Sequence, residues 1–295
     1  MQWPQDLIGF TKAVNRAPTC FSRFINIQPQ RHGGDLLRKG ANWGSFLCLS
    51  LAEELDFKAV LAMNQDQYLS RTSLVMGEKA LLRLSQSRVI VCGLGGVGSA
   101  AAEALARSGI GFLKLIDGDV VDKTNLNRQL VALRSNIGQD KVQALKNRLL
   151  DAAPKTKVEA IKAFLTPLNI KHYIFDTDYV VDCIDDIEAK TALIVFCLQN
   201  HIGIVSSMGA GGRLDPTLIR SGDISDTNTD PLAKVMRKRL REHGIEKGLK
   251  VIYSLEKPVK ATAIEGKLLI GSTAFVPPAT GFALASLVVR DLANE

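Results

Sequence analysis

The chain has 295 residues, of which 46% are hydrophobic and 23% charged, and its formal net charge is +7. This composition is ordinary for a globular protein long enough to bury a substantial core, and the basic balance fits a phosphate-rich partner. No apolar run reaches about 18 residues without a charge, which excludes a standard transmembrane helix. The five cysteines form no C-x-x-C pair, so we expect no zinc site.

The first 62 residues differ from the rest of the chain. The first 50 contain six Lys and Arg residues against two acidic residues. This pattern weakly resembles a transit peptide, and a poorly ordered extension fits equally well. We therefore predict an N-terminal extension over 1–62 and a folded region over 63–295.

From residue 77 onward, short apolar runs alternate with helical patterns. Apolar and β-branched residues predict strands, and amphipathic spacing predicts helices. The alternation indicates an α/β fold with a mostly parallel sheet and helices on both faces. The apolar stretch 274–289, which contains two prolines and a glycine, is expected to form a buried strand and a helix. The expected strands are 87–92, 112–117, 157–161, 178–184, 202–207 and 268–275, and the expected helices are 77–84, 98–108, 138–153, 187–199 and 230–243.

A glycine-rich turn follows the first predicted strand. Gly93, Gly95 and Gly98 fit the G-x-G-x-x-G spacing, with Gly96 between them, and an alanine-rich helix follows. Such a turn lets the backbone approach phosphate at a helix N-terminus. Asp117 ends the next strand, about where an acidic residue meets a ribose hydroxyl in Rossmann-like folds. The pattern predicts an adenine nucleotide site, most simply that of a nicotinamide-dependent oxidoreductase.

Polar residues further along favour a different nucleotide chemistry. A hydride-transfer enzyme has no need of additional Arg, Lys and Asp residues near the phosphates. An enzyme that attacks the α-phosphate of ATP does, because cations neutralise developing charge and a carboxylate holds Mg²⁺. The candidate residues are Asn125, Arg128, Gln129, Lys141 and the adjacent pair Asp185 and Asp186 at the end of the strand 178–184.

These motifs, taken in order, resemble the ThiF/MoeB/ubiquitin-activating superfamily of ATP-dependent adenylating enzymes. The resemblance covers about Tyr68 to about Leu284. Within the superfamily, the chain looks most like the tRNA threonylcarbamoyladenosine dehydratases. The segments that carry this likeness are Ser70-Arg71-Thr72, Ala104 to Gly111, Ser206 to Gly212, Asp215-Pro216-Thr217, Asp230 to Ala233 and Ser254 to Pro258.

The resemblance implies roles for individual residues. The glycines Gly93, Gly95, Gly96 and Gly98, with Asp117, Asn125 and Gln129, are expected to bind ATP. Arg128 and Lys141 are expected to contact its phosphates. Asp185 is expected to bind Mg²⁺, although Asp186 stands where relatives carry Asn or Ser, so either carboxylate could take the metal. Arg71 is expected to reach the ATP of a second subunit in a homodimer. Asp119 would orient a neighbour or cap a turn.

The family likeness also implies a reaction and a partner. The folded region is expected to be an ATP-binding adenylating domain with C-terminal substrate-binding elements. The expected activity is ATP-dependent dehydration of threonylcarbamoyladenosine in tRNA through an acyl-adenylate, with the basic helix 230–243 contacting tRNA phosphates. We expect a cytoplasmic protein, with mitochondrial association as the alternative.

Three other functions stay open from the sequence. The first is MoeB- or ThiF-like adenylation of the C-terminus of a small sulfur-carrier or ubiquitin-like protein. The chain has no cysteine after Cys197, which disfavours thioester chemistry of the ubiquitin-activating type. The second is a pseudoenzyme that binds nucleotide or tRNA without turnover. The oxidoreductase is least favoured, because Arg128, Lys141 and Asp185 would have no role in it.

Overall fold

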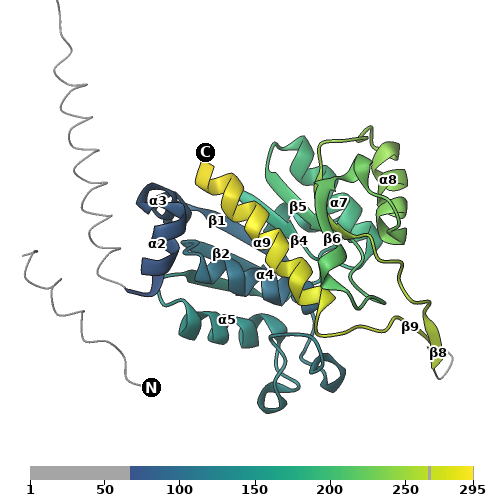
Figure 1. Ribbon diagram of the computed structural model, residues 1–295, viewed down its shortest axis with the longest axis horizontal. Helices are drawn as coiled ribbons and strands as arrows, with labels where there is room; N and C mark the ends of the chain where they lie inside the picture. Colours follow the sequence, from purple (N-terminus) through teal and green to yellow (C-terminus); the bar gives the residue numbers. More distant parts are fainter. Residues whose placement is uncertain (1–66, 265–266, 295) are drawn as a thin grey trace, which may run out of the picture. The chain divides into compact units, whose positions relative to one another are not determined.

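The computed structural model describes residues 67–264 and 267–294, which lie in one compact unit, Ala52–Glu295 (Figure 1). The predicted extension over 1–62 falls outside the described residues. Among the described helices, none is both long and apolar enough to cross a membrane.

A seven-stranded sheet forms the centre of the fold (Figure 1). Its strand order is β3-β2-β1-β4-β5-β7-β6, and every neighbouring pair is parallel except β6 and β7. This arrangement confirms the predicted Rossmann-like α/β fold. The strands are β1 (Arg88–Cys92), β2 (Phe112–Ile116), β3 (Lys157–Ile161), β4 (Tyr179–Asp182), β5 (Gly203–Ser207), β6 (Ile219–Asp223) and β7 (Lys250–Ser254).

The apolar strands form because the central sheet is covered on both faces. In β1, Val89 and Val91 belong to one hydrophobic cluster, while Ile90 and Cys92 belong to the other. A strand buried on both faces reads as a continuous apolar run, which is why these segments could be predicted from the sequence.

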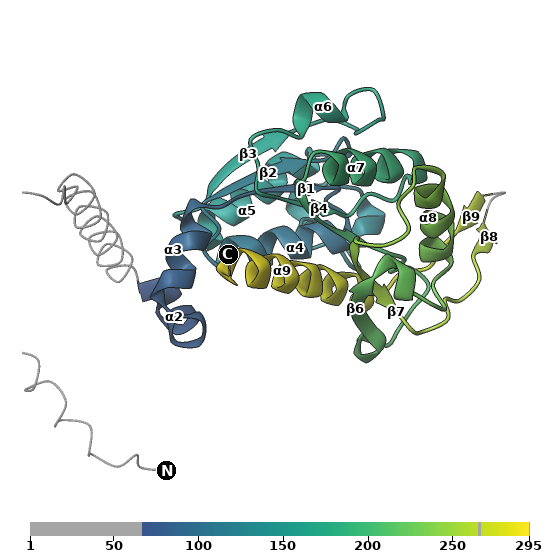
Figure 2. The same cartoon turned by 90° about the horizontal axis from the view of Figure 1, so that it is seen from above.

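Helices from different parts of the chain cover each face (Figure 2). The helices α3 (Glu78–Gln86), α4 (Gly96–Arg107), α5 (Lys141–Ala152) and α9 (Val276–Asn294) contribute to the first cluster. The helices α6 (Ile170–Tyr173), α7 (Ile187–Gln199) and α8 (Pro231–Glu242) contribute to the second. Helices α4 and α9 pack closely because Gly281 has no side chain, and a Cβ there would lie 2.2 Å from the carbonyl oxygen of Val97.

Two predictions near the C-terminus were wrong in whole or in part. Of the expected strand 268–275, only residues 268 and 269 are in a strand: they belong to β9 (Lys267–Leu269), which pairs with β8 (Thr262–Ile264) in a separate two-stranded ribbon. The ribbon leaves Leu269 and Ile270 exposed, so their apolar character does not report burial here. The stretch 274–289 contains no strand, since α9 begins at Val276 and runs through it.

Candidate functional site

The strand order reverses at the carboxyl end of β1. The chain passes from β1 outward to β2 and β3, then returns to β4 on the other side of β1. In open α/β sheets, ligands bind at the carboxyl ends of the strands where the order reverses in this way. The glycine turn follows β1, Asp117 follows β2, and Asp185 follows β4, so the topology brings these predicted residues to one edge.

The glycines of the turn do different things. Gly93 has φ +83°, and a Cβ there would lie 2.7 Å from the carbonyl oxygen of Cys183. A Cβ on Gly98 would lie 1.7 Å from the carbonyl oxygen of Gly93. Gly96 begins α4 and faces Pro277. A Cβ on Gly95 would meet nothing nearer than the Gln129 Nε2 at 3.9 Å. Protein packing therefore requires Gly93 and Gly98, whereas Gly95 borders open space at the start of α4.

The Asp117 carboxylate holds two backbone segments together. Its Oδ2 accepts a hydrogen bond from the Leu94 N–H at 2.6 Å, and its Oδ1 accepts one from the Asp119 N–H at 2.7 Å. A carboxylate oxygen can accept a second hydrogen bond. Asp117 can thus fix the glycine turn and still accept from a ligand hydroxyl.

Lys141 is a buried cation oriented by a neighbouring acid. It opens α5, is 5% exposed, and its Nζ lies 2.8 Å from the Asp119 Oδ2. The Lys141 N–H also donates to the Asp119 carbonyl oxygen at 3.0 Å. Of the two roles that the sequence left open for Asp119, orientation of a neighbour is the one seen in the geometry.

Arg128 and Gln129 lie on the loop between β2 and α5. The Arg128 Nη1 donates to the Thr124 carbonyl oxygen at 2.9 Å and to the Asn127 Oδ1 at 2.8 Å, both neutral acceptors. Neutral acceptors therefore hold the guanidinium in place, and its positive charge is not compensated by a carboxylate in either of these bonds. Gln129 is 7% exposed, and its buried Oε1 has no hydrogen-bond partner among the described residues. Because buried polar atoms are normally satisfied, this oxygen is suited to accept from a ligand.

Asn125 has a local structural role. It ends the 3₁₀ helix η3 (Lys123–Asn125), and its Oδ1 accepts from the Asp122 N–H at 3.0 Å. Asp122 in turn accepts from the Thr124 N–H, which completes a capping box. Asn125 thereby shapes the loop that presents Arg128 and Gln129.

The two adjacent carboxylates after β4 have different partners. The Asp186 Oδ1 accepts from the Ala189 N–H at 2.8 Å and caps α7. Asp185 is exposed and makes no side-chain hydrogen bond or ion pair with the described residues. Within the described ranges, no group of three or more His, Cys, Asp or Glu side chains could by itself hold a metal ion. Mg²⁺ is commonly bound by one or two carboxylates together with phosphate oxygens and water, and Asp185 fits that donor set.

A fully buried ion pair lies behind Asp185, and the sequence analysis missed it. The Lys190 Nζ is 2.7 Å from the Asp182 Oδ2, and both side chains are completely buried. The same Oδ2 accepts from the Ser206 Oγ at 2.6 Å, and the Asp182 Oδ1 accepts from the Ile184 N–H at 3.1 Å. These bonds fix the turn that leads to Asp185. The available signal was an Asp within an apolar strand followed by a Lys within an apolar helix.

A second buried pair, Arg213 with Asp230, joins the loop 209–213 to α8. The Arg213 Nη2 lies 3.0 Å from the Asp230 Oδ2, and its Nε donates to the Glu256 carbonyl oxygen at 2.9 Å. Its Nη1 donates to the Gly209 carbonyl oxygen. Asp230 also caps α8 through the Ala233 N–H. The predicted glycine loop and the predicted basic helix are therefore one connected unit.

Arg71 is not brought to this edge within a single subunit. It is exposed on α2 (Ser70–Met76). This helix begins directly after Leu69, whose side chain lies against Gly109. Gly109 precedes β2, so α2 is connected to the amino-terminal edge of the sheet, opposite the glycine turn. The same helix carries two large apolar side chains, Leu74 and Val75, and each of them is 86% exposed.

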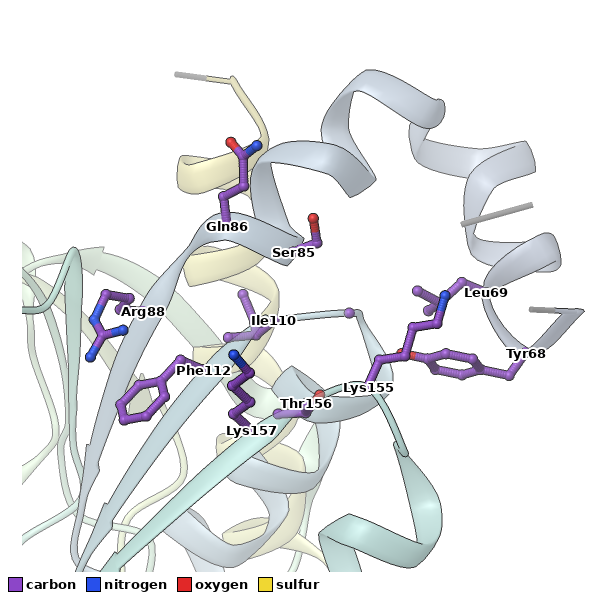
Figure 3. A pocket seen from close by; sticks show the side chains of 12 residues that line it. Tyr68, Leu69, Ser85, Gln86, Arg88, Ile110, Phe112, Lys155, Thr156 and Lys157 are labelled. Atoms are coloured by element: carbon purple, nitrogen blue, oxygen red, sulfur yellow. The ribbon is translucent and has the colours of Figure 1, made fainter. Parts of the chain in front are cut away.

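Two cavities in the described part of the chain lie away from the glycine turn. One, of about 360 Å³, lies at the amino-terminal edge of the sheet, where Tyr68, Ile110 and Thr156 are among its lining residues (Figure 3). The other, of about 630 Å³, is bordered by Leu168, Phe196 on α7 and Arg239 on α8.

The described cysteines are poor nucleophiles. Burial raises the pKa of the Cys92 thiol well above its usual value, and Asp182 raises it further. Burial also raises the pKa of Cys183, and it raises the pKa of Cys197 to about 12. Since the thiolate is the reactive form, these three residues are unsuited to thioester chemistry at neutral pH.

Comparison with known proteins gives consistent relatives. A family model described as "ThiF family" matches residues 69–266. The tRNA threonylcarbamoyladenosine dehydratase of Bacillus subtilis (strain 168) is 44% identical over 240 residues, which cover 77% of this chain and 94% of that protein. The Escherichia coli (strain K12) protein of the same name is 40% identical over 229 residues, covering 74% and 85%. The crystal structure of E. coli tRNA N6-threonylcarbamoyladenosine dehydratase, TcdA, in complex with ATP matches with a TM-score of 0.72 and 38% identity, covering 77% of this chain and 94% of that one.

Proposed function

This chain belongs to the ThiF family, and we propose that it catalyses the ATP-dependent dehydration of threonylcarbamoyladenosine in tRNA. The observation that carries the proposal is the 44% identity to a tRNA threonylcarbamoyladenosine dehydratase over 94% of that protein's length. The match to an ATP-bound TcdA structure supports the nucleotide. The polar groups gathered after β1, β2 and β4 are those that activation of a carboxylate by ATP requires.

ATP would lie across the carboxyl ends of β1 and β2. The phosphates would face the open side of Gly95 at the start of α4, where N–H groups and the helix dipole favour anions. The ribose would meet Asp117, whose carboxylate is already fixed by two backbone N–H groups. Gln129, with its unpaired buried oxygen, would accept from the same ligand.

Arg128 and Lys141 would stabilise charge on the reacting phosphate. A carboxylate oxygen of the threonylcarbamoyl group attacks the α-phosphorus, and the bond to the bridging oxygen breaks, which releases pyrophosphate and leaves an acyl-adenylate. Negative charge accumulates on the α-phosphate oxygens in this step. Two cations that are already in position lower the energy of the transition state, because they need no reorganisation at the moment of reaction.

The second half-reaction closes a ring. A neighbouring nitrogen or oxygen of the same modification attacks the activated carbonyl carbon and loses its proton, and AMP leaves with the former carboxylate oxygen. The substrate thereby loses the elements of water, and that oxygen departs in AMP. Holding both reacting groups in one molecule supplies proximity, which is a large part of the rate enhancement in intramolecular reactions.

Mg²⁺ would be held by Asp185. This exposed carboxylate follows the β4 strand, while its neighbour Asp186 is engaged in capping α7. A bound Mg²⁺ supplies positive charge to the phosphates of the nucleotide. The Asp182–Lys190 pair would keep the turn that carries Asp185 in place.

The active unit would be a homodimer in which Arg71 serves the partner's site. Arg71 lies far from the glycine turn of its own subunit but next to Leu74 and Val75, whose exposed apolar surface a second copy could cover. Loss of activity in Arg71→Ala, restored by mixing with a Lys141→Ala variant, would support this arrangement. A monomer with full activity would contradict it.

The exposed face of α8 would contact tRNA phosphates. Lys234, Lys238 and Arg241 are exposed and spaced three or four residues apart, so they form one stripe along the helix. Arg237 is instead turned inward, where its Nη1 donates to the Thr227 carbonyl oxygen at 2.8 Å. Because Asp230 connects α8 to the loop 209–213, a tRNA on this stripe would be placed next to the catalytic edge.

The deciding experiment is incubation of the full chain with ATP and tRNA that carries threonylcarbamoyladenosine, followed by mass spectrometry of the nucleosides. We expect the modified nucleoside to lose the mass of one water, and we expect Lys141→Ala to slow this conversion strongly. An unchanged nucleoside despite ATP binding would refute the proposal. Pyrophosphate exchange stimulated by a small carrier protein would then indicate the MoeB-like activity instead.

A further inference from the structure

The side-chain amide of Asn127 connects Arg128 to a distant part of the chain. Its Oδ1 accepts a hydrogen bond from the Arg128 Nη1 at 2.8 Å, and its Nδ2 donates to the Ser272 carbonyl oxygen at 2.9 Å. One end of an amide accepts and the other donates, and both ends are used here. A reversed amide would turn its NH₂ group toward the guanidinium and its oxygen toward a carbonyl, so the two contacts together fix its orientation.

Ser272 lies on a segment that is attached to the loop 209–213. The Gly212 N–H donates to the Gly271 carbonyl oxygen at 2.7 Å. Gly212 has φ +70°, and a Cβ there would lie 2.9 Å from the carbonyl oxygen of Val259. The loop can approach its neighbours this closely because residue 212 has no side chain.

The other side of Ser272 is attached to the same loop. The Thr273 Oγ1 donates to the Arg213 carbonyl oxygen at 3.2 Å. Arg213 is buried against Asp230, which caps α8. The Ser272 carbonyl oxygen is therefore positioned by the loop that adjoins α8, and not by the loop that carries Arg128.

Arg128 depends on Asn127 for one of its two anchors. The other anchor is the Thr124 carbonyl oxygen, which accepts from the same Nη1 at 2.9 Å. Among the residues that the structure describes, the Arg128 Nη2 and Nε have no partner, so these donors stay available to phosphate oxygens. Without the Asn127 amide, a single hydrogen bond would hold the long side chain, and its guanidinium could take up other positions.

We propose that Asn127 is a positioning residue that couples the loop 209–213 to Arg128. This inference rests on the proposed function, in which Arg128 stabilises the reacting phosphate and a tRNA on α8 lies next to this loop. The attacking carboxylate arrives with the tRNA, while Arg128 meets the phosphate, so productive attack needs the two in a fixed relation. The Asn127 amide supplies that relation. It would act on the adenylation step and leave the binding of ATP nearly unchanged.

The test separates the rate of reaction from the binding of ATP. Dehydration of tRNA that carries threonylcarbamoyladenosine is followed at varied ATP concentrations with the full-length wild type, Asn127→Ala and the control Asn147→Ala. Asn147 is likewise exposed, and its Oδ1 accepts from the Gln143 Nε2 at 2.8 Å. We expect Asn127→Ala to lower kcat about 10- to 100-fold, because a small displacement of a catalytic group has effects of this size. Its KM for ATP and its Tm should stay near those of the wild type, and Asn147→Ala should match the wild type throughout.

A double variant tests whether Asn127 acts through Arg128. Arg128→Ala removes the group that is positioned, so adding Asn127→Ala should cause no further loss in single-turnover rate. Losses that multiply would overturn the inference, as would an Asn127→Ala variant with wild-type kcat or with a change in KM for ATP alone. A wild type that converts no modified tRNA would instead refute the proposed function, and this inference with it.

A variant of the loop tests the other end of the connection. Gly212→Ala brings a Cβ within 2.9 Å of the Val259 carbonyl oxygen and should displace the segment 271–273. We expect this variant to lower kcat, and we expect little further loss when it is combined with Asn127→Ala, because the connection is then already broken. The full effect of Gly212→Ala in the Asn127→Ala background would show that the loop does not act through Asn127, which contradicts the proposed coupling.

Discussion

Replacement of Lys190 by methionine should strongly destabilise the protein, because it leaves the Asp182 carboxylate buried without a counter-charge. Both side chains are fully buried, and the Lys190 Nζ lies 2.7 Å from the Asp182 Oδ2. Methionine keeps most of the aliphatic volume of lysine, so the variant removes the charge and creates little cavity. Breaking a buried pair in this way lowers the free energy of unfolding by about 3–5 kcal/mol.

The expected loss is large enough to measure without ambiguity. For domains of about 150–250 residues, each 1 kcal/mol shifts Tm by about 2–4 °C, so the shift should be about 6–20 °C. The double variant Asp182→Asn/Lys190→Met should recover most of this loss. The Oδ1 of the neutral asparagine can still accept from the Ile184 N–H, and its Nδ2 can donate to the Ser206 Oγ, because a hydroxyl accepts as well as donates.

Thermal unfolding followed by circular dichroism gives the Tm of each variant. The matched control is Lys162→Met, which breaks the Lys162–Asp140 pair, whose side chains are 52% and 37% exposed. An exposed pair contributes about 0–1 kcal/mol, so this Tm should hardly change. A loss below about 1 kcal/mol in Lys190→Met, or a double variant no more stable than the single one, would refute the reasoning.

Three further predictions follow from the same geometry. Gly95→Ala should fold like the wild type, because its Cβ enters only open space, but it should bind ATP more weakly in calorimetry, because that space is where the phosphates would lie. Gly98→Ala should instead unfold at a lower temperature, because its Cβ would lie 1.7 Å from the carbonyl oxygen of Gly93. Equal Tm values in the two variants would contradict this prediction. Lys141→Ala should lower kcat by about 10²–10³-fold, as measured by AMP release, and Asp119→Asn in that background should restore part of the loss by removing an unpaired negative charge beside the phosphates. Burial tends to raise the pKa of Glu103, but hydrogen bonds from Arg148 and Arg107 outweigh burial, so the pKa is lowered. The ionised Glu103 therefore stabilises the protein above about pH 4, and this stabilisation is lost as the pH falls and the carboxylate is protonated. The difference in Tm between the wild type and Glu103→Gln should therefore be largest near neutral pH and shrink in acid; a constant difference would count against it.

The elements that could be predicted are those with strong local signals. The strand Arg88–Cys92 could be predicted from its apolar composition, and the glycine turn after it from the spacing of its glycines. β6 was missed because it is an edge strand of sequence Ile-Arg-Ser-Gly-Asp, whose exposed Arg220 and Ser221 give no apolar run. An edge strand needs only its hydrogen-bonded neighbour β7, so little of its sequence reports the pairing.

Within the site, residues whose role is to hold other parts of the protein in place were harder to predict than residues that would contact a ligand. The sequence placed Asp185 and Asp186 together without distinguishing them. A helix was predicted to begin at residue 187, and an Asp just before a helix is a strong N-cap candidate, so the capping role of Asp186 had a local signal. The pairing of Arg213 with Asp230 had none, because the two residues meet only when the loop 209–213 folds against α8.

The two cations of the candidate site differ in how their charge is balanced before a nucleotide arrives. Lys141 is buried against the Asp119 carboxylate, so its charge is partly compensated and its position is fixed. Arg128 is held only by a carbonyl and an amide oxygen, so its full charge stays available to a ligand. Preorganised charge of this kind stabilises a transition state best when its fixation needs no ligand. The loop between β2 and α5 thus provides the fixation, through Asp119 and the capping box at Asn125, and leaves the phosphates to provide the missing negative charge.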